Sequence, residues 1–144
     1  MKRAVIDASV ILKWYLLDEV HGENALALLY EYVAGRLEIL APSLATYEVM
    51  NGLVIAGRRA RFEEDAIATS IDSFMSLGIR FYDVSLFADK LIYYSLRYDR
   101  SVYDASYLSL ADQEGVDMIT ADQRLYNSVK KDLPWVHWVG GVEK

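Results

Sequence analysis

Residues 4–9 read Ala-Val-Ile-Asp-Ala-Ser, a short apolar run that ends on an acidic residue, Asp7. An apolar run of this length predicts a buried strand, and Ser9 can cap the helix that is predicted to follow it. Residues 116–122 repeat the arrangement as Val-Asp-Met-Ile-Thr-Ala-Asp and end on Asp122. Carboxylates at the C-terminal ends of neighbouring parallel strands face one crevice, which is where open α/β sheets bind ligands. The two runs therefore predict a parallel sheet with acids at one end of its strands.

Strand-like and helical patterns alternate between and around these two runs. Helices are predicted where apolar residues recur at helical spacing, over residues 9–17, 23–34, 44–56, 62–77, 85–98, 102–114 and 122–129. Further strands are predicted over residues 37–40, 79–84 and 135–139. Such alternation favours right-handed crossovers and a parallel sheet covered on both faces. We therefore predict an α/β fold, a three-layer α/β/α sandwich with a central parallel sheet, in a single domain over residues 1–144.

The composition excludes several kinds of site. The sequence has no cysteine, which rules out disulfides, thiolate catalysis and cysteine-ligated zinc, and its two histidines make a poor set of metal ligands. A net charge of −6 argues against a protein that coats nucleic acid through a general positive field, although a basic turn at residues 57–61 could hold a phosphate backbone. No apolar run approaches the ~20 residues of a membrane span and no signal peptide is apparent, so we expect a cytoplasmic protein.

Glu48 lies inside a helical segment that is otherwise rich in apolar residues. Helical spacing places it on the face of Leu44, Asn51 and Ile55. A glutamate on that face would be buried, which is unfavourable unless the glutamate meets a cation. The alternative is a glutamate on the solvent side of the helix, because polar residues in the segment leave its buried face ambiguous.

Asp104 lies on the same helical stripe as Tyr107 and Leu108, which is the apolar, core-facing side of its helix. It also lies in the first turn, where the helix dipole favours an anion, so a capping role is the alternative. Capping is equally the alternative for Asp7 and Asp122, which both precede helices. A capping role does not explain why Asp104 faces inward, since a buried acid is costly without a partner.

Four acids that are far apart in the sequence, Asp7, Glu48, Asp104 and Asp122, are thus candidates for one site. Carboxylates gathered in a crevice repel one another unless a cation lies among them. Oxygen-only ligation suits hard ions such as Mg²⁺ or Mn²⁺. Thr120, at the end of its strand, is a candidate for orienting these ligands. The pattern predicts a metal-dependent enzyme of phosphate chemistry, in which a bound ion activates water.

Four short segments contain these acids: Val5-Ile6-Asp7-Ala8-Ser9, Tyr47-Glu48-Val49-Met50-Asn51, Tyr103-Asp104-Ala105-Ser106-Tyr107-Leu108 and Ile119-Thr120-Ala121-Asp122. Together they resemble the PIN-domain ribonucleases, and most closely the VapC-type toxins of prokaryotic toxin–antitoxin pairs. The segments occur in the family's order and at its usual spacing, over essentially the whole chain. Any one of them is a weak match, but four in register are a strong one.

This resemblance implies a PIN-like fold and an endoribonuclease whose four acids hold Mg²⁺ or Mn²⁺. Ser9 and Thr120 match positions that support the metal site in the family, and Asn51 matches a common neighbour of the glutamate. Hydrolysis of the RNA phosphodiester would leave 5′-phosphate and 3′-hydroxyl ends. The resemblance further implies a homodimer and a cognate VapB-like antitoxin whose tail enters the active-site groove.

Three other functions stay open at this point. The motifs do not separate a toxin from a housekeeping PIN nuclease of RNA processing. A phosphatase or a receiver domain also places Asp at strand ends, but residues 7–9 read Asp-Ala-Ser rather than Asp-x-Asp, and no lysine ends a late strand as a receiver needs. A non-catalytic RNA-binding or regulatory protein would bind its partner without metal.

The helices predicted over residues 44–56 and 62–77 form a predicted hairpin around the basic turn. Their apolar residues, among them Val49, Leu53 and Met75, are more than one core face needs. The sequence therefore predicts that this hairpin contacts another protein chain.

Overall fold

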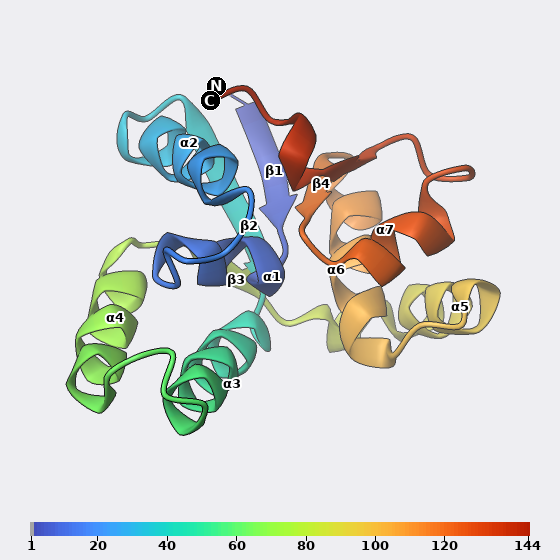
Figure 1. Ribbon diagram of the computed structural model, residues 1–144. Coiled ribbons are helices and arrows are strands. Elements are labelled where there is room, and N and C mark those ends of the chain that lie inside the picture. Colours follow the sequence, from blue (N-terminus) through green and yellow to red (C-terminus); the bar gives the residue numbers. More distant parts are fainter. Residues whose placement is uncertain (1) are drawn as a thin grey trace.

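Five parallel strands form the central sheet, in the order β3-β2-β1-β4-β5 (Figure 1). The computed structural model describes residues 2–144. The strands span Lys2–Ile6 (β1), Leu37–Pro42 (β2), Arg80–Tyr82 (β3), Asp117–Thr120 (β4) and Val136–Trp138 (β5). In this order β1 lies in the middle of the sheet, with β2 on one side and β4 on the other. The predicted parallel α/β fold is confirmed.

The central strands are apolar because helices cover both of their faces. Val5 and Ile6 of β1 and Ile39 and Leu40 of β2 are fully buried. A strand that faces water on one side would alternate apolar and polar residues, whereas a strand buried on both sides needs a continuous apolar run. The run that begins at Ala4 is therefore the signature of the sheet's centre.

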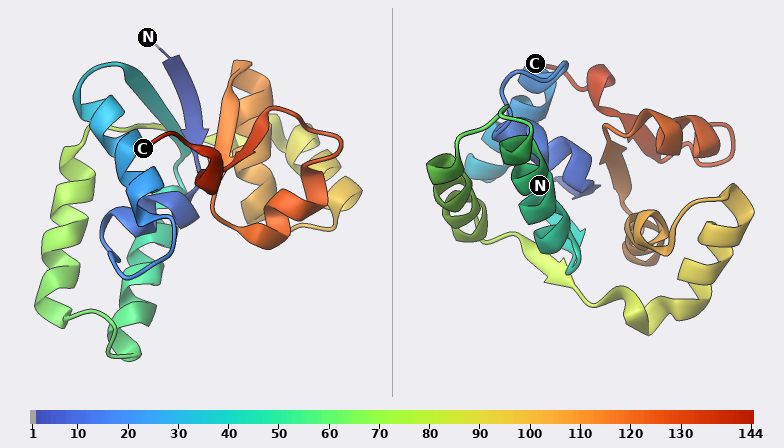
Figure 2. Two further views of the ribbon diagram at one scale, coloured as in Figure 1. Left: turned by 45° about the horizontal axis from the view of Figure 1, so that its top comes forward. Right: turned by 60° about the horizontal axis from the view of Figure 1, so that its bottom comes forward.

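Seven α-helices surround the sheet. They span Ala8–Ile11 (α1), Gly22–Val33 (α2), Ala45–Arg58 (α3), Glu64–Ser76 (α4), Ala88–Tyr98 (α5), Val102–Glu114 (α6) and Gln123–Val129 (α7) within the described residues 2–144. Three short 3₁₀ helices also occur, Leu12–Trp14 (η1), Val84–Phe87 (η2) and Val139–Gly141 (η3). The helix α6 packs across β1, β2 and β4 on one face, with α5 outside it, while α1, α2 and α7 lie on the other face. The α3–α4 hairpin extends beyond the C-terminal ends of the strands (Figure 2).

Two helices differ from the prediction by about three residues at one end, and the other elements by at most two residues. The helix predicted over residues 9–17 is the four-residue α1 followed by η1. The helix predicted to start at Ser85 starts at Ala88, because the carboxylate of Asp83 accepts a hydrogen bond from the Ser85 backbone N–H at 3.1 Å and so caps η2 instead. Asp83 therefore ends the strand region earlier than the apolar pattern indicates.

The prediction that the α3–α4 hairpin exposes surplus apolar surface is wrong for Val49, Leu53 and Phe74, which are buried in the core. Ile67 and Ile71 are partly buried against the core, whereas Met75 is exposed. Another group of exposed apolar side chains lies on η2, α5 and the start of α6, at Leu86, Ile92, Tyr93, Leu96, Val102 and Tyr103. This second group is named the α5 patch below.

The basic turn of the hairpin is tied to a neighbouring loop. Arg61 forms ion pairs with Asp18 at 3.1 Å and with Glu19 at 3.3 Å. Glu19 also pairs with Lys13 of η1 at 3.2 Å. Acidic partners therefore neutralise Arg61, one of the three arginines of the turn that was predicted to hold a phosphate backbone.

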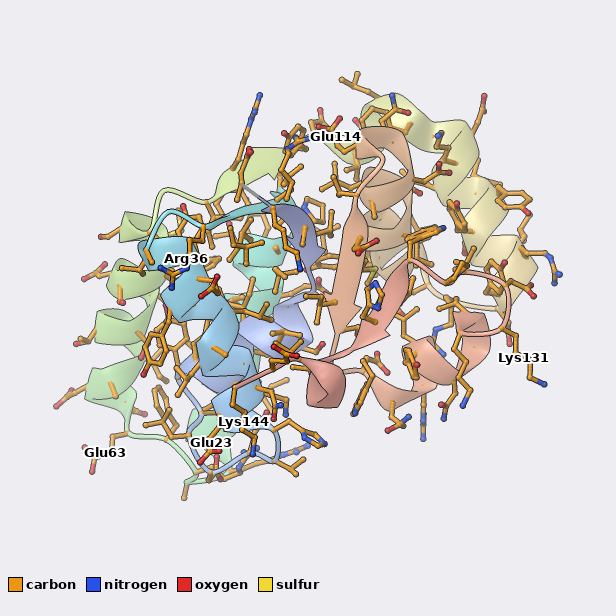
Figure 3. The ribbon with its side chains drawn as sticks, turned by 90° about the horizontal axis from the view of Figure 1, so that it is seen from above. Glu23, Arg36, Glu63, Glu114, Lys131 and Lys144 are labelled. Atoms are coloured by element: carbon orange, nitrogen blue, oxygen red, sulfur yellow. The ribbon has the colours of Figure 1, made fainter. Side chains whose placement is uncertain are left out.

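The C-terminal residues return to α2. Asn24 donates a hydrogen bond to the Val142 carbonyl at 2.7 Å, and Lys144 pairs with Glu23 at 3.1 Å (Figure 3). These contacts lie away from the ends of β1 and β4 that carry the acids. No helix within residues 2–144 has the length and apolar character needed to cross a membrane.

Candidate active site

Two of the four acids are brought together by the pairing of β1 with β4. Ile6 lies opposite Ile119 in this parallel pair, and the Asp7 N–H donates to the Ile119 carbonyl at 3.0 Å. Asp7 therefore leaves β1 at the level where β4 reaches Thr120. Asp122 follows two residues later and begins α7. The prediction that these two runs end side by side is confirmed.

The Asp7 carboxylate is held by two hydroxyl groups. Its Oδ2 accepts hydrogen bonds from Ser9 Oγ and from Thr120 Oγ1, both at 2.8 Å. Each hydroxyl in turn accepts a backbone N–H at 3.0 Å, that of Ala121 for Ser9 and that of Asp122 for Thr120. The network fixes the orientation of the carboxylate and joins the ends of β1 and β4.

Asp7 does not act as a helix cap, although it precedes α1. Its side chain makes no capping hydrogen bond, and Ser9 lies inside α1 rather than before it, which corrects the capping role expected for Ser9. Only 6% of Asp7 is exposed to solvent. Burial raises the pKa of Asp7 from its usual 3.8 to about 7, against the hydrogen bonds from Thr120 and Ser9, and the charges of Glu48 and Asp104 add to the increase.

Glu48, in the first turn of α3, is held by a buried tyrosine. Tyr107 of α6 donates its hydroxyl to Glu48 Oε1 at 2.6 Å. Burial raises the pKa of Glu48, the bond from Tyr107 lowers it, and the charge of Asp104 raises it again. Burial and the neighbouring acids Asp7 and Glu48 hold the pKa of Tyr107 well above its usual value, so the phenol stays a hydrogen-bond donor.

Asp104 lies in the first turn of α6 but leaves the capping role to another residue. Ser101 caps this helix by accepting the Asp104 backbone N–H at 3.0 Å. The Asp104 carboxylate therefore takes no part in capping. Its Oδ2 accepts two hydrogen bonds from Arg100, from Nε at 3.0 Å and from Nη2 at 2.9 Å.

Asp122 caps α7, as its alternative reading predicts. Its Oδ1 accepts the Leu125 backbone N–H at 3.1 Å. The other oxygen, Oδ2, lies 3.9 Å from Nη2 of Arg100. Arg100 therefore stands between Asp104 and Asp122, which come from different elements.

Asn51 does not join this group. It is exposed on α3, one turn beyond Glu48, and makes no side-chain hydrogen bond to the four acids in the described part of the chain. Arg100 and Tyr107, by contrast, contact the acids although sequence reasoning assigned them no role. Arg100 and Asp104 are four residues apart, a spacing at which ion pairs form along a helix. This spacing is the feature of the sequence that could have indicated their contact.

The donor atoms of the crevice suit a hard divalent ion. They are all oxygens, and among residues 2–144 no lysine or arginine lies within ion-pair distance of Asp7 or Glu48. Burial is the main cause of the raised pKa of Asp7 and of Glu48, and neighbouring acids add to it, Glu48 and Asp104 for Asp7 and Asp104 for Glu48. A cation would relieve this local excess of negative charge. In this conformation, however, no three acidic side chains of the described residues converge closely enough to form one metal-binding group. Asp104 and Asp122 face Arg100 instead.

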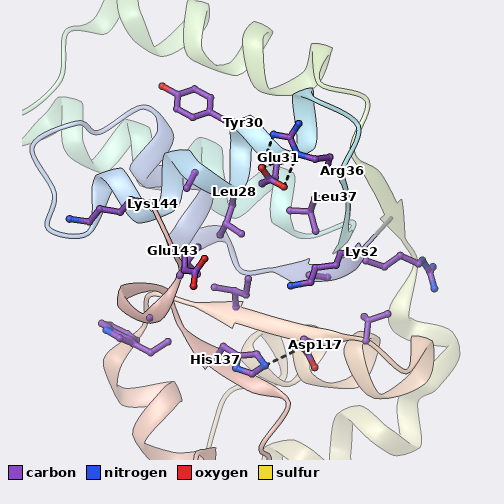
Figure 4. A pocket seen from close by; sticks show the side chains of 18 of the residues that line it. Lys2, Leu28, Tyr30, Glu31, Arg36, Leu37, Asp117, His137, Glu143 and Lys144 are labelled. Carbon is purple, nitrogen blue, oxygen red and sulfur yellow. Dashed lines mark hydrogen bonds and ion pairs between the residues drawn. The ribbon is translucent and has the colours of Figure 1, made fainter.

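A cavity of about 1260 Å³ lies elsewhere, at the N-terminal ends of β1, β2 and β4 (Figure 4). None of the four acids lines it. Four of its lining side chains pair with one another, Arg36 with Glu31 at 2.7 Å and His137 with Asp117 at 3.1 Å. The acidic crevice at the opposite ends of the strands is therefore the better candidate for an active site.

Ribonucleases of other organisms are similar to this chain over most of its length. Ribonuclease VapC3 of Pyrobaculum aerophilum is 29% identical over 127 residues, which cover 85% of this chain and 92% of that protein. Ribonuclease VapC9 of Mycobacterium tuberculosis is 28% identical over 130 residues, which cover 90% of this chain and 94% of that protein.

Solved structures agree on the fold. The crystal structure of PAE2754 from Pyrobaculum aerophilum has a TM-score of 0.66 and 26% identity, and the match covers 96% of this chain and 90% of that one. A chain of a toxin–antitoxin complex from Klebsiella pneumoniae has a TM-score of 0.59 and 17% identity, over 93% of this chain and 95% of that one.

The family model of the PIN domain matches residues 4–131. That region begins inside β1 and ends just after α7, so it contains all four acids and the elements that position them. Sequence, fold and the placement of the acids lead to one assignment: the chain belongs to the PIN-domain family.

Proposed function

We propose that the protein is a metal-dependent endoribonuclease and the VapC-type toxin of a toxin–antitoxin pair. The observation that carries this proposal is the buried Asp7, which two hydroxyls orient at the end of β1 and which shares the crevice with Glu48 and Asp104. The VapC ribonucleases among its relatives support RNA as the substrate. A single domain over residues 1–144 and a cytoplasmic location stay predictions.

Asp7, Glu48, Asp104 and Asp122 would hold Mg²⁺ or Mn²⁺ in this proposal. A bound ion would supply an activated water and would stabilise the charge that develops on the phosphate. The protein's own contribution is to position its ligands: Ser9 and Thr120 orient Asp7, and Tyr107 orients Glu48. Asn51 is exposed beside the crevice, where an RNA strand can reach it.

The proposed protein partners are a second copy of the chain and a VapB-like antitoxin. The α5 patch supports this part of the proposal, because Leu96 is 79% exposed and Ile92 and Tyr93 are each more than half exposed. Ile92 and Leu96 are one helical turn apart on α5, and exposed apolar side chains that lie together mark contact surfaces. A short open reading frame directly upstream of the gene would favour a toxin over a housekeeping PIN nuclease.

Asp104→Asn tests the proposed function directly. Loss of groups that only support metal ligands costs about 10- to 100-fold in activity, so loss of a ligand is expected to lower RNA cleavage in Mg²⁺ or Mn²⁺ by at least about 100-fold. Folding should survive, because Ser101 caps α6 through the backbone of residue 104. Arg100 pairs with Asp104 at 2.9 Å, so we expect no gain in stability from relieved repulsion between the acids.

Asp112→Asn is the matched control on the same helix. Asp112 lies two turns beyond Asp104, accepts the Tyr94 hydroxyl at 2.8 Å and lies 3.4 Å from Lys90, so its partners lie outside the crevice. Its substitution should keep wild-type cleavage. An Asp104→Asn protein as active as Asp112→Asn would refute the role of Asp104, and RNA binding that persists unchanged without metal and without cleavage would favour a non-catalytic binding protein.

Tyr107→Phe tests how Glu48 is positioned. The substitution keeps the buried ring and removes the hydroxyl that donates to Glu48 at 2.6 Å. We expect cleavage to fall about tenfold and Mn²⁺ binding to weaken, since groups that orient metal ligands have effects of this size. Tyr94→Phe is the control, because it removes a tyrosine–carboxylate bond of 2.8 Å outside the crevice. Equal activity in the two variants, measured on one RNA substrate, would show that the Tyr107 hydroxyl has no part in the site.

A further inference from the structure

Arg100 is the cation of the crevice. Its guanidinium lies 2.9 Å from Asp104 and 3.9 Å from Asp122. No other arginine or lysine among residues 2–144 lies within ion-pair distance of any of the four acids. The side chain of Arg100 is 21% exposed, so the contact with Asp104 is largely shielded from water. Asp7 and Glu48, on the other side of the crevice, have no such partner among the described residues.

The backbone of Arg100 is fixed by the turn that joins α5 to α6. Asp99 adopts the left-handed conformation, with φ 51°, and ends α5. The Arg100 N–H then donates to the Ser95 carbonyl at 3.1 Å, and the Ser95 hydroxyl donates to the Arg100 carbonyl at 2.6 Å. With both backbone groups bonded, only the side chain of Arg100 is free to change position.

The two bonds to Asp104 use the same carboxylate oxygen. Nε and Nη2 both donate to Oδ2, and a carboxylate oxygen has two lone-pair sites. Both sites of Oδ2 are therefore filled by the guanidinium, and this oxygen cannot bind a metal ion at the same time. A positive charge in this position also repels a divalent ion that approaches Asp122.

We propose that Arg100 is a resident counter-ion that competes with the metal for Asp104 and Asp122. Binding of a divalent ion is then an exchange, in which the guanidinium leaves Asp104 Oδ2 as the ion arrives. This inference rests on the proposed metal dependence and adds to it a residue that sets how tightly the ion binds. It also accounts for the absence of a converged acidic group in the described residues, since two of the four acids are turned toward Arg100.

The test is Mn²⁺ binding, measured by titration calorimetry at low ionic strength on the wild type and on Arg100→Met. Methionine keeps much of the side-chain length and removes the charge and the donors. Arg100→Met is expected to bind Mn²⁺ about tenfold more tightly than the wild type, because one competing unit charge at this range has an effect of that order. In EDTA the same variant should melt at a lower temperature than the wild type, since Asp104 and Asp122 lose their counter-ion.

Arg97→Met is the matched control. Arg97 lies on α5 and pairs with Asp132 at 3.2 Å, away from the four acids. Its substitution should leave Mn²⁺ affinity within about twofold of the wild type. Should Arg100→Met fail to fold, Arg100→Lys is the second variant, because it keeps the charge but has one ammonium group in place of the guanidinium. Its Mn²⁺ affinity is expected to be higher than that of the wild type, by less than about tenfold.

The outcomes separate this inference from the proposed function. If the wild type binds Mn²⁺ and the folded Arg100 variants bind it equally or more weakly, Arg100 positions Asp104 rather than competing for it, and the inference is overturned while metal dependence stands. If neither the wild type nor the variants bind Mn²⁺, the proposed metal dependence fails, and the inference fails with it.

Discussion

Chelation of divalent ions with EDTA is expected to stop RNA cleavage by this protein completely, and added Mg²⁺ or Mn²⁺ is expected to restore it. The crevice offers carboxylates, two hydroxyls, a guanidinium and a tyrosine whose pKa lies well above its usual value. The two histidines lie elsewhere, His137 paired with Asp117 at 3.1 Å and His21 against Trp138. Without a metal ion, these groups provide little means of activating water at neutral pH.

Asp7 is the strongest alternative to the metal as a source of a base, because its pKa is raised to about 7. Its Oδ2 is already occupied by two hydroxyl donors, and the residue is almost fully buried. We therefore expect no metal-free activity. EDTA that has been saturated with Mg²⁺ is the control and should leave cleavage intact. Full cleavage in metal-free EDTA would replace the metal mechanism with one in which Asp7 is the general base.

Asp7→Asn is expected to abolish cleavage and, in EDTA at pH 8, to make the folded protein more stable than the wild type. The amide keeps an oxygen that can accept the hydrogen bonds of Ser9 and Thr120, but it carries no charge. The wild type must keep a buried carboxylate ionised at this pH, beside Glu48 and Asp104. We expect the melting temperature to rise by roughly 5 °C.

The pH dependence gives the sign of this effect. The folded-state pKa of Asp7, about 7, lies above its usual 3.8, so between these values the folded protein binds a proton that the unfolded chain has released. The contribution of protonated Asp7 to the free energy of unfolding is complete below about pH 4 and is lost as the pH rises through about 7. Melting temperatures in EDTA should therefore fall across this range for the wild type, and fall less for Asp7→Asn. Asp112→Asn should follow the wild type; an Asp7→Asn protein no more stable than the wild type at pH 8 would show that Asp7 is well solvated.

The sheet and the place of its acids were predictable because they depend on simple periods. A strand buried on both faces requires a continuous apolar run, as in residues 4–6, and the parallel pairing of β1 with β4 then brings Asp7 and Thr120 together. The side of α3 that faces the crevice was not predictable from its own residues. Glu48 faces the crevice because Tyr107 of α6, which is distant in the sequence, supplies a buried hydrogen-bond donor for it.

The position of Arg100 was not predictable because it depends on the conformation of a turn. Asp99 takes a left-handed φ that usually calls for glycine or asparagine, and this rotation directs Arg100 back toward α6. The α5 patch was missed for a related reason. Ile92, Tyr93 and Leu96 follow helical spacing like core residues, and only the packing of α5 outside α6 leaves them exposed.

The position of β1 in the middle of the sheet has a consequence for the synthesis of the protein. β1 leaves the ribosome before the other strands of the sheet, but one of its two neighbours, β4, begins only at Asp117. At a translation rate of about 5–20 residues per second, the nascent chain holds Asp7 for many seconds before Thr120 and Asp122 emerge beside it. The acidic crevice is therefore completed only after β4 and the start of α7 have been synthesised, and a ribosome-bound fragment that stops short of β4 lacks Thr120 and Asp122.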